Sequence, residues 1–260
     1  MRSVVKFFGI LSVAGFCAMP ALAQPVGNFD GVLSGDYGSS DLSGAGHAND
    51  WGFDGAGALN LGWSNLAIQG EGGWHDFNDH DLGGNWNDWN AGGAVYWSGH
   101  WARVGATAGY QSESGQLTGH ATNYGGFGEL YAGPMFTLGL KGGGFSGDGG
   151  LDGGNVGVEG IVYLWRNIAF SGTYDYYHLN SAGNENDWGG RLEWLVSSRL
   201  PVSLWGGYEH SQVGGLGHAN SFLLGLKLYT DGFGPAPLVE RQRGGVEQWG
   251  TNFSPAGYVY

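Results

Sequence analysis

From about residue 29 onward, apolar and polar residues alternate along almost the whole chain. Between residues 51 and 63, Trp51, Phe53 and Leu59 fall on one parity, whereas Asp54 and Asn60 fall on the other. Successive side chains of a β-strand point to opposite faces, so this pattern predicts a strand with one apolar and one polar face. The same alternation recurs in segments 66–76, 155–165, 167–178 and 219–229.

The alternation predicts about twelve strands. They lie near residues 29–38, 51–63, 66–76, 89–98, 100–112, 123–132, 135–145, 155–165, 167–178, 187–197, 201–212 and 219–229. With a rise of ~3.3 Å per residue and a tilt of ~40°, a strand of about ten to twelve residues covers about 25–30 Å, the thickness of the hydrocarbon layer. The chain is therefore predicted to be all-β and to form a transmembrane antiparallel up-and-down β-barrel.

The connections between these strands alternate in length. Tight turns are predicted at Ser64-Asn65, Ser98-Gly99, Gly133-Pro134, Arg166-Asn167 and Ser198-Arg199-Leu200. Longer polar links are predicted at 39–50, 77–88, 113–122, 146–154, 179–186 and 213–218. Short periplasmic turns and longer outer loops are typical of outer-membrane barrels. Aromatic residues gather near the strand ends, as expected for rings at the two membrane interfaces.

With these features, the chain resembles the Gram-negative outer-membrane β-barrel proteins, in particular the porin-like group of small barrels. The resemblance covers residues 29–229 and rests on strand length, alternation and connection length. It implies a location in the outer membrane, with lipid and lipopolysaccharide as surroundings. It says less about the transported substance.

Both ends of the chain differ from the barrel segment. Residues 1–23 are predicted to be a cleaved signal peptide, because Arg2 and Lys6 precede an apolar stretch that ends in an Ala21-Leu22-Ala23 cleavage pattern. Residues 24–229 are predicted to form the barrel. Alternation stops after Tyr229, so residues 230–260 are predicted to be a periplasmic tail or a plug.

Composition and charge exclude several functions. Cys17 is the only cysteine and lies in the predicted signal, so neither a disulfide nor a zinc–thiolate site is expected. The formal net charge of the whole chain is −13 at pH 7. Nucleic-acid binding depends on Lys and Arg contacts to phosphates, so nucleic acid is not an expected partner.

If the apolar parity faces lipid, the polar parity faces the lumen of the barrel. The predicted lumen charges are Glu71, Arg103, Glu129, Lys141, Glu159, Asp175, Arg191, Glu193, Glu209 and Lys227. Their acidic surplus is small, so Asp79, Asp81 and Asp88 are expected to dominate as an acidic mouth. This favours a weakly cation-selective channel for passive diffusion of small hydrophilic solutes or ions. The alternative is a non-conducting structural or surface-interaction barrel whose lumen is closed by salt bridges.

Catalytic, metal and cofactor sites are not expected. Seven of the eight histidines fall in or beside the predicted long links, but no pair has a fixed spacing that identifies a zinc or copper site. His210 and Ser211 are adjacent, so on one strand they point to opposite faces and cannot act as a catalytic pair. The protein is therefore expected not to be an enzyme.

Overall fold

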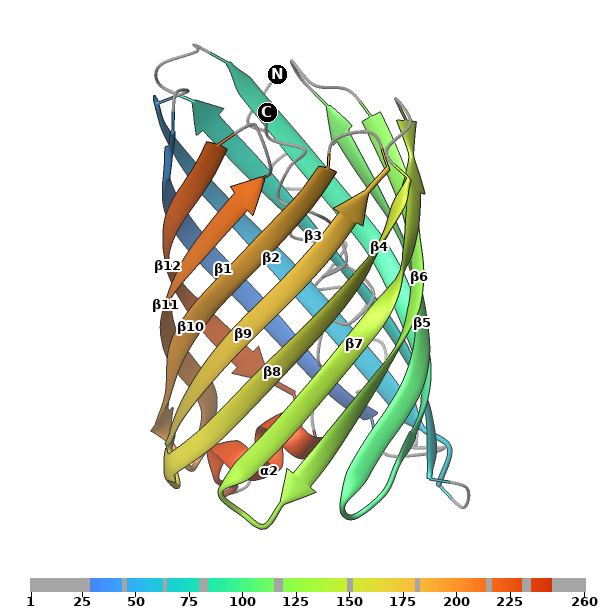
Figure 1. Cartoon of the computed structure of the whole chain (residues 1–260). Coiled ribbons are helices and arrows are strands. Elements are labelled where there is room, and N and C mark those ends of the chain that lie inside the picture. The colour runs from blue at the N-terminus through green and yellow to red at the C-terminus, as the bar shows by residue number, and fades with distance from the viewer. Residues whose placement is uncertain are drawn as a thin grey trace, which may run out of the picture.

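A computed structural model describes residues 29–43, 46–62, 65–79, 84–114, 119–148, 152–180, 183–213, 217–230 and 235–244. Twelve antiparallel strands form one closed barrel, in which each strand pairs with its neighbours in sequence (Figure 1). The strands are β1 Phe29–Leu42, β2 Gly46–Asn60, β3 Leu66–Asp79, β4 Asn85–Ser98, β5 Ala102–Ser114, β6 Gly119–Ala132, β7 Phe136–Gly147, β8 Gly153–Trp165, β9 Ile168–Leu179, β10 Gly183–Ser197, β11 Leu200–Val213 and β12 Gly217–Tyr229. The predicted all-β barrel and its number of strands are confirmed.

The first and last strands close the barrel. β1 and β12 pair antiparallel from Val32 opposite Tyr229 to Leu42 opposite Ala219. A closed ladder has no edge strand, so its backbone donors and acceptors are satisfied without water. This is the property that allows β-structure to lie in a hydrocarbon layer.

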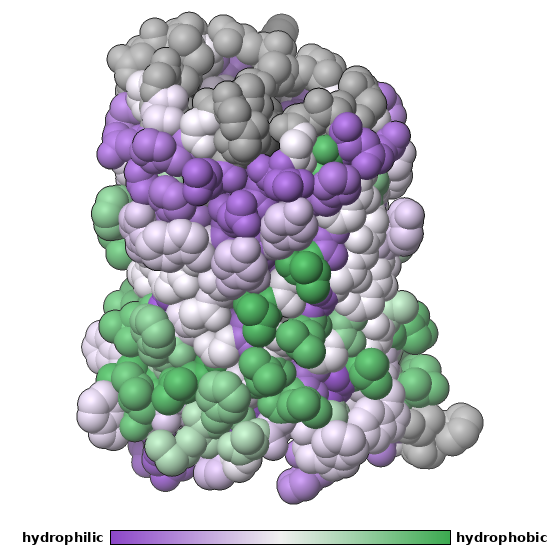
Figure 2. Space-filling view, viewed as in Figure 1, coloured by the Kyte–Doolittle hydropathy of each residue, from purple (hydrophilic) through white to green (hydrophobic). Residues whose placement is uncertain are grey.

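Alternate residues on each strand divide the barrel into an outer and an inner surface. The outer surface exposes large apolar side chains such as Val95, Leu140, Phe222 and Leu224. On the face that Figure 2 shows, hydrophobic residues gather over the half of the barrel towards α2 and the tight turns, and hydrophilic residues lie nearer the other end. Among the described residues, no helix is long and apolar enough to span a membrane.

The tight turns predicted at 98–99, 133–134, 166–167 and 198–200 lie at or beside short connections between strands, and Ser64 of the fifth turn lies outside the described residues. The strands, however, extend into the predicted long links. β1 continues to Leu42 and β2 begins again at Gly46, so most of segment 39–50 belongs to the sheet. The same extension occurs in the other five links. Outside the hydrocarbon layer an outward side chain has no need to be apolar, so alternation fades while the backbone ladder continues. The prediction of long links was therefore wrong.

A short helix, α2 (Leu238–Gly244), follows the last strand and lies at the tight-turn end of the barrel (Figure 1). The backbone N–H of Leu238 donates to the carbonyl of Arg166, and that of Ala236 donates to the carbonyl of Ser198. Leu238 is fully buried in the main apolar cluster, which also includes Leu195. Residues 1–28, which include the predicted signal peptide, and residues 231–234 and 245–260 lie outside the described residues.

Candidate functional site: the barrel lumen

The ten charged residues predicted to line the lumen all lie on the inward parity of their strands. Their exposure differs widely. Arg103 and Glu193 are almost completely buried, whereas Glu209 is exposed although it points inward. An exposed inward carboxylate shows that the lumen contains solvent-accessible space. The ten residues therefore include both buried structural charges and charges in contact with the interior space.

Glu193 is the centre of a hydrogen-bond network near the tight-turn end. Its Oε1 accepts hydrogen bonds from the hydroxyl of Ser203, at 2.6 Å, and from that of Tyr229. Its Oε2 accepts from Nζ of Lys227 at 3.3 Å and from Nε2 of Gln242 at 3.2 Å. This carboxylate therefore ties β10, β11, β12 and α2 together, and its role is primarily structural.

Arg243 of α2 makes a second set of contacts at this end. Its guanidinium donates to the carbonyls of Gly133 and Phe136, both at 2.7 Å, and to Oγ1 of Thr137 at 3.1 Å. The same group lies 4.8 Å from the ring centre of Tyr131. The carbonyl of Arg243 in turn accepts a hydrogen bond from Arg103. These contacts hold the helical segment against the inner wall.

Arg103 also belongs to an ion pair on the inner wall. Its Nη1 lies 3.7 Å from Oε2 of Glu129, which also accepts a hydrogen bond from the hydroxyl of Tyr131 at 2.6 Å. Glu71 has a different partner, because its Oε2 accepts from Nε2 of Gln69 at 2.6 Å. These buried carboxylates are therefore held in place by neighbouring donors.

The remaining predicted lumen charges lie on β7 to β12. Nζ of Lys141 lies 2.8 Å from Oδ1 of Asp175. The guanidinium of Arg191 stacks over the indole of Trp205, 4.5 Å from its ring centre. A small cavity adjoins these charges, and it is lined by residues that include Glu159, Arg191, Glu193, Lys227 and Gln242.

The lumen is much more acidic than the sequence analysis predicted. Eight further carboxylates lie on the inward parity of the described strands: Asp30, Asp36, Asp50, Asp54, Asp88, Glu113, Glu185 and Asp187. Together with the six predicted ones, fourteen inward carboxylates face four inward Lys and Arg side chains of the described strands. The expectation of a small internal surplus was therefore wrong. The strand ends lack an apolar face and are therefore predicted as links, and the predicted lumen set does not include polar-parity residues such as Asp54.

The predicted acidic mouth is only partly described. Asp88 lies within β4 and points into the lumen, where its Oδ2 accepts a hydrogen bond from Nε2 of Gln111 at 3.2 Å. It is therefore a wall residue and not part of a loop. Asp79 is the last residue of β3, and its side chain and the whole of Asp81 lie outside the described residues.

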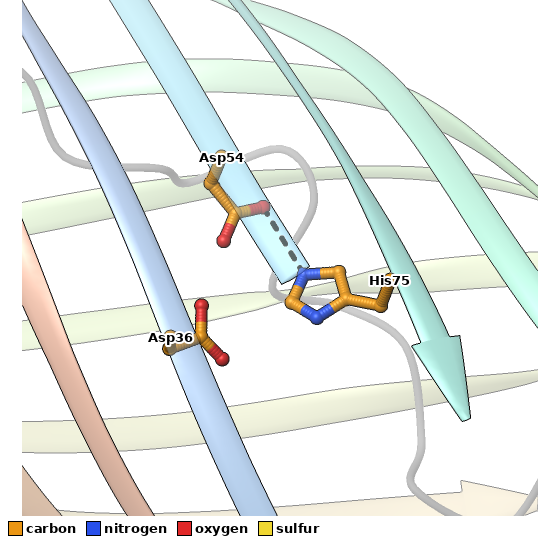
Figure 3. A group of neighbouring side chains, drawn as sticks. All are labelled: Asp36, Asp54 and His75. Carbon is orange, nitrogen blue, oxygen red and sulfur yellow. Dashed lines mark hydrogen bonds and ion pairs between the residues drawn. The ribbon is translucent and has the colours of Figure 1, made fainter. Parts of the chain in front are cut away.

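Three inward residues that the sequence analysis did not group come together on neighbouring strands. Asp36 of β1, Asp54 of β2 and His75 of β3 converge inside the barrel (Figure 3). Asp54 and His75 fall on the polar parity of their strands, so their direction could have been predicted. Their proximity could not, because it depends on the pairing of β1, β2 and β3.

Comparison with known proteins agrees with the class that this fold defines, a membrane-spanning β-barrel. Residues 8–196 match the family described as outer membrane protein beta-barrel domain. The chain belongs to this family and is an outer-membrane β-barrel. A search of curated proteins found no match.

Solved structures with a similar fold include a channel, an autotransporter translocator domain and a porin. An outer-membrane channel from Pseudomonas putida F1 is 10% identical, with a TM-score of 0.56 over 80% of this chain and 97% of the channel. The translocator domain of the autotransporter NalP from Neisseria meningitidis is 9% identical, with a TM-score of 0.55 over 87% and 97%. The KdgM porin in complex with disordered oligogalacturonate is 9% identical, with a TM-score of 0.51 over 76% and 98%. At these identities the likeness concerns the fold alone.

Proposed function

We propose that this protein is an outer-membrane channel for passive diffusion of small hydrophilic solutes or ions, with a preference for cations. The observation that carries the proposal is the excess of inward carboxylates over inward Lys and Arg in the described strands. A lumen lined by one sign of charge and bounded by a wall of low dielectric concentrates ions of the opposite sign. The exposure of the inward Glu209 supports an interior that ions can reach.

The sign of the lumen charge does not suit the ligand that is named with one of the structural neighbours. The KdgM porin is described in complex with oligogalacturonate, which is a chain of acidic sugars. An acidic lumen repels a polyanion, and the described strands contribute only Arg103, Lys141, Arg191 and Lys227 as inward cations. We therefore propose cations and neutral solutes as the substances that pass, and not acidic oligosaccharides.

The test is electrical measurement on the purified full-length protein in planar bilayers. Discrete single-channel steps are expected, together with a reversal potential of the sign for cation preference in a KCl gradient. The preference should fade near 1 M salt, where the screening length falls to ~3 Å. Anion preference at low salt would contradict the proposed charge distribution.

A non-conducting barrel is the second candidate, and the contacts of α2 favour it. Arg243 and Gln242 fix this segment to the inner wall at the tight-turn end. If the segment plugs the lumen, the same bilayer experiment gives no steps from the full-length protein.

We also propose that the barrel has no catalytic activity. Nδ1 of His210 lies 2.8 Å from Oδ1 of Asn220 on the outward parity, whereas Ser211 is on the inward parity of the same strand. These two adjacent residues therefore lie on opposite sides of the wall. Assay of the purified protein with ester substrates should give no hydrolysis above the rate in buffer.

A further inference from the structure

Asp36, Asp54 and His75 lie near the middle of β1, β2 and β3, on the inner wall of the barrel (Figure 3). Each of the three offers one ligand atom, and these atoms all lie within 4.8 Å of one another. Nε2 of His75 is 3.4 Å from Oδ1 of Asp54. Both side chains are mostly buried, at 19% and 16% exposure.

These separations can be compared with those around a bound metal ion. A zinc ion held tetrahedrally at ~2.0–2.2 Å by nitrogen and oxygen ligands places the ligand atoms about 3.3–3.6 Å apart. The His75–Asp54 separation already has this value. The three ligand atoms as a group lie within 4.8 Å of one another, so a bound ion requires the Asp36 carboxylate to move closer to the other two.

The wall around the three residues is shaped by two inward glycines. The imidazole of His75 lies over Gly52, where a Cβ atom would overlap it. The carboxylate of Asp54 lies over Gly73 in the same way. Gly52 is opposite both Asp36 and His75 in the strand register, so the residue between them carries no side chain. The three groups can therefore approach one another across the sheet.

The charges around the group are mostly negative, although the guanidinium of Arg191 also acts on the charge of Asp36. Asp88 is directly opposite His75 on β4, is only 9% exposed, and has a buried Oδ1 with no hydrogen-bond partner among the described residues. Asp50 is a second buried carboxylate on β2. No Lys or Arg lies directly opposite Asp36, Asp54 or His75 on the paired strands. The residues at those positions are Gly52, Gly225, Ser34, Gly73 and Asp88.

We propose that Asp36, Asp54 and His75 form a binding site in the lumen for a divalent transition-metal ion, with Zn²⁺ as the expected type. An imidazole ligand favours Zn²⁺ and its neighbours in the first transition row over Ca²⁺ and Mg²⁺, which prefer oxygen ligands alone. Asp88 supplies further negative charge beside His75. The competing arrangement is a plain ion pair between protonated His75 and Asp54, with no affinity for metal.

Titration of Zn²⁺ into the full-length folded barrel in detergent, with the heat of binding measured by calorimetry, tests this site. The unaltered protein should show one binding event that a large excess of Ca²⁺ does not abolish. Asp54→Asn, His75→Gln and Asp36→Asn should each weaken this event at least tenfold. Binding is measured without current, so a barrel that conducts nothing leaves the test intact.

Two matched variants control for charge and for surface histidines. Asp76→Asn removes a carboxylate from the outward parity of β3, next to His75 in sequence. His120→Gln removes an exposed histidine that pairs with Asp148 at 2.6 Å. Both should bind Zn²⁺ within twofold of the unaltered protein.

The site is refuted if the lumen variants bind as tightly as these controls, or if Ca²⁺ competes with Zn²⁺ on equal terms in the unaltered protein. The calcium competition needs no variant, so misfolding of a mutant does not prevent a decision.

Discussion

Charged side chains have different surroundings in two regions of the inner wall, the tight-turn end and the middle of β1 to β4. At the tight-turn end, Glu193 accepts four hydrogen bonds and Arg243 donates three, and both join the barrel to α2. Midway along β1 to β4, by contrast, Asp36, Asp54 and Asp88 lie around a single histidine. Buried charges with several partners fix a structure, whereas clustered charges of one sign attract ions. The difference suggests a structural end and an ion-interacting middle.

The largest effect is expected for Glu193→Ala at the structural end. The change leaves Lys227 without its ion-pair partner and removes the acceptor of Ser203 and Tyr229. Breaking such a buried pair costs roughly 3–5 kcal/mol in free energy of unfolding. The loss in free energy of unfolding is measured by urea unfolding in detergent, with the folded fraction determined from the heat-modifiable shift on gels.

Glu209→Gln is the control for this change, because it also removes an inward carboxylate but at an exposed position. It should alter the free energy of unfolding by less than about 0.5 kcal/mol, as for most exposed substitutions. Equal losses in the two variants would contradict the division into a structural end and an ion-interacting middle.

Removal of α2 should have the next largest effect. A chain that stops after Thr230 keeps the complete β1–β12 pairing, so the barrel should still fold and insert. It loses every contact of Arg241, Gln242 and Arg243 with the inner wall. Single-channel conductance should therefore rise severalfold. An unchanged conductance would mean that the segment does not obstruct the path of ions.

A smaller effect is expected when charge is removed from the ion-interacting middle. Asp50→Asn with Asp88→Asn removes two buried inward carboxylates, and the cation-to-anion permeability ratio should fall by about twofold at low salt. Reversal potentials in a KCl gradient measure the change. The double variant Asp41→Asn with Asp76→Asn removes the same charge from the outward parity and should leave the ratio unaltered. A similar fall in both variants would show that net charge alone matters.

The smallest effect is expected on the outer surface. His120 and Asp148 form an exposed pair, with side chains 55% and 52% exposed. Such pairs contribute about 0–1 kcal/mol, because solvent screens them, so His120→Gln should barely alter the unfolding midpoint. A shift as large as that of Glu193→Ala would show that this outer pair is as important as the inner network.

Much of the barrel could be predicted from the sequence, because alternation is a local property. The parity of Glu71, Glu129 or Lys227 follows from its own neighbours, and a strand turns each parity to one face whatever it pairs with. The tight turns are equally local. The strand ends were harder to predict, since the segment around Asp50 has no apolar face once its strand leaves the hydrocarbon layer.

What only the tertiary structure decided is which inward residues meet. Asp36, Asp54 and His75 are on three strands, and their distances depend on the register between those strands. Register in a closed barrel is constrained by all twelve pairings together and by the stagger needed for closure, which no short segment encodes. The docking of α2 is similar. Its partners Arg166, Ser198 and Phe136 lie in distant hairpins that come together only when the barrel closes.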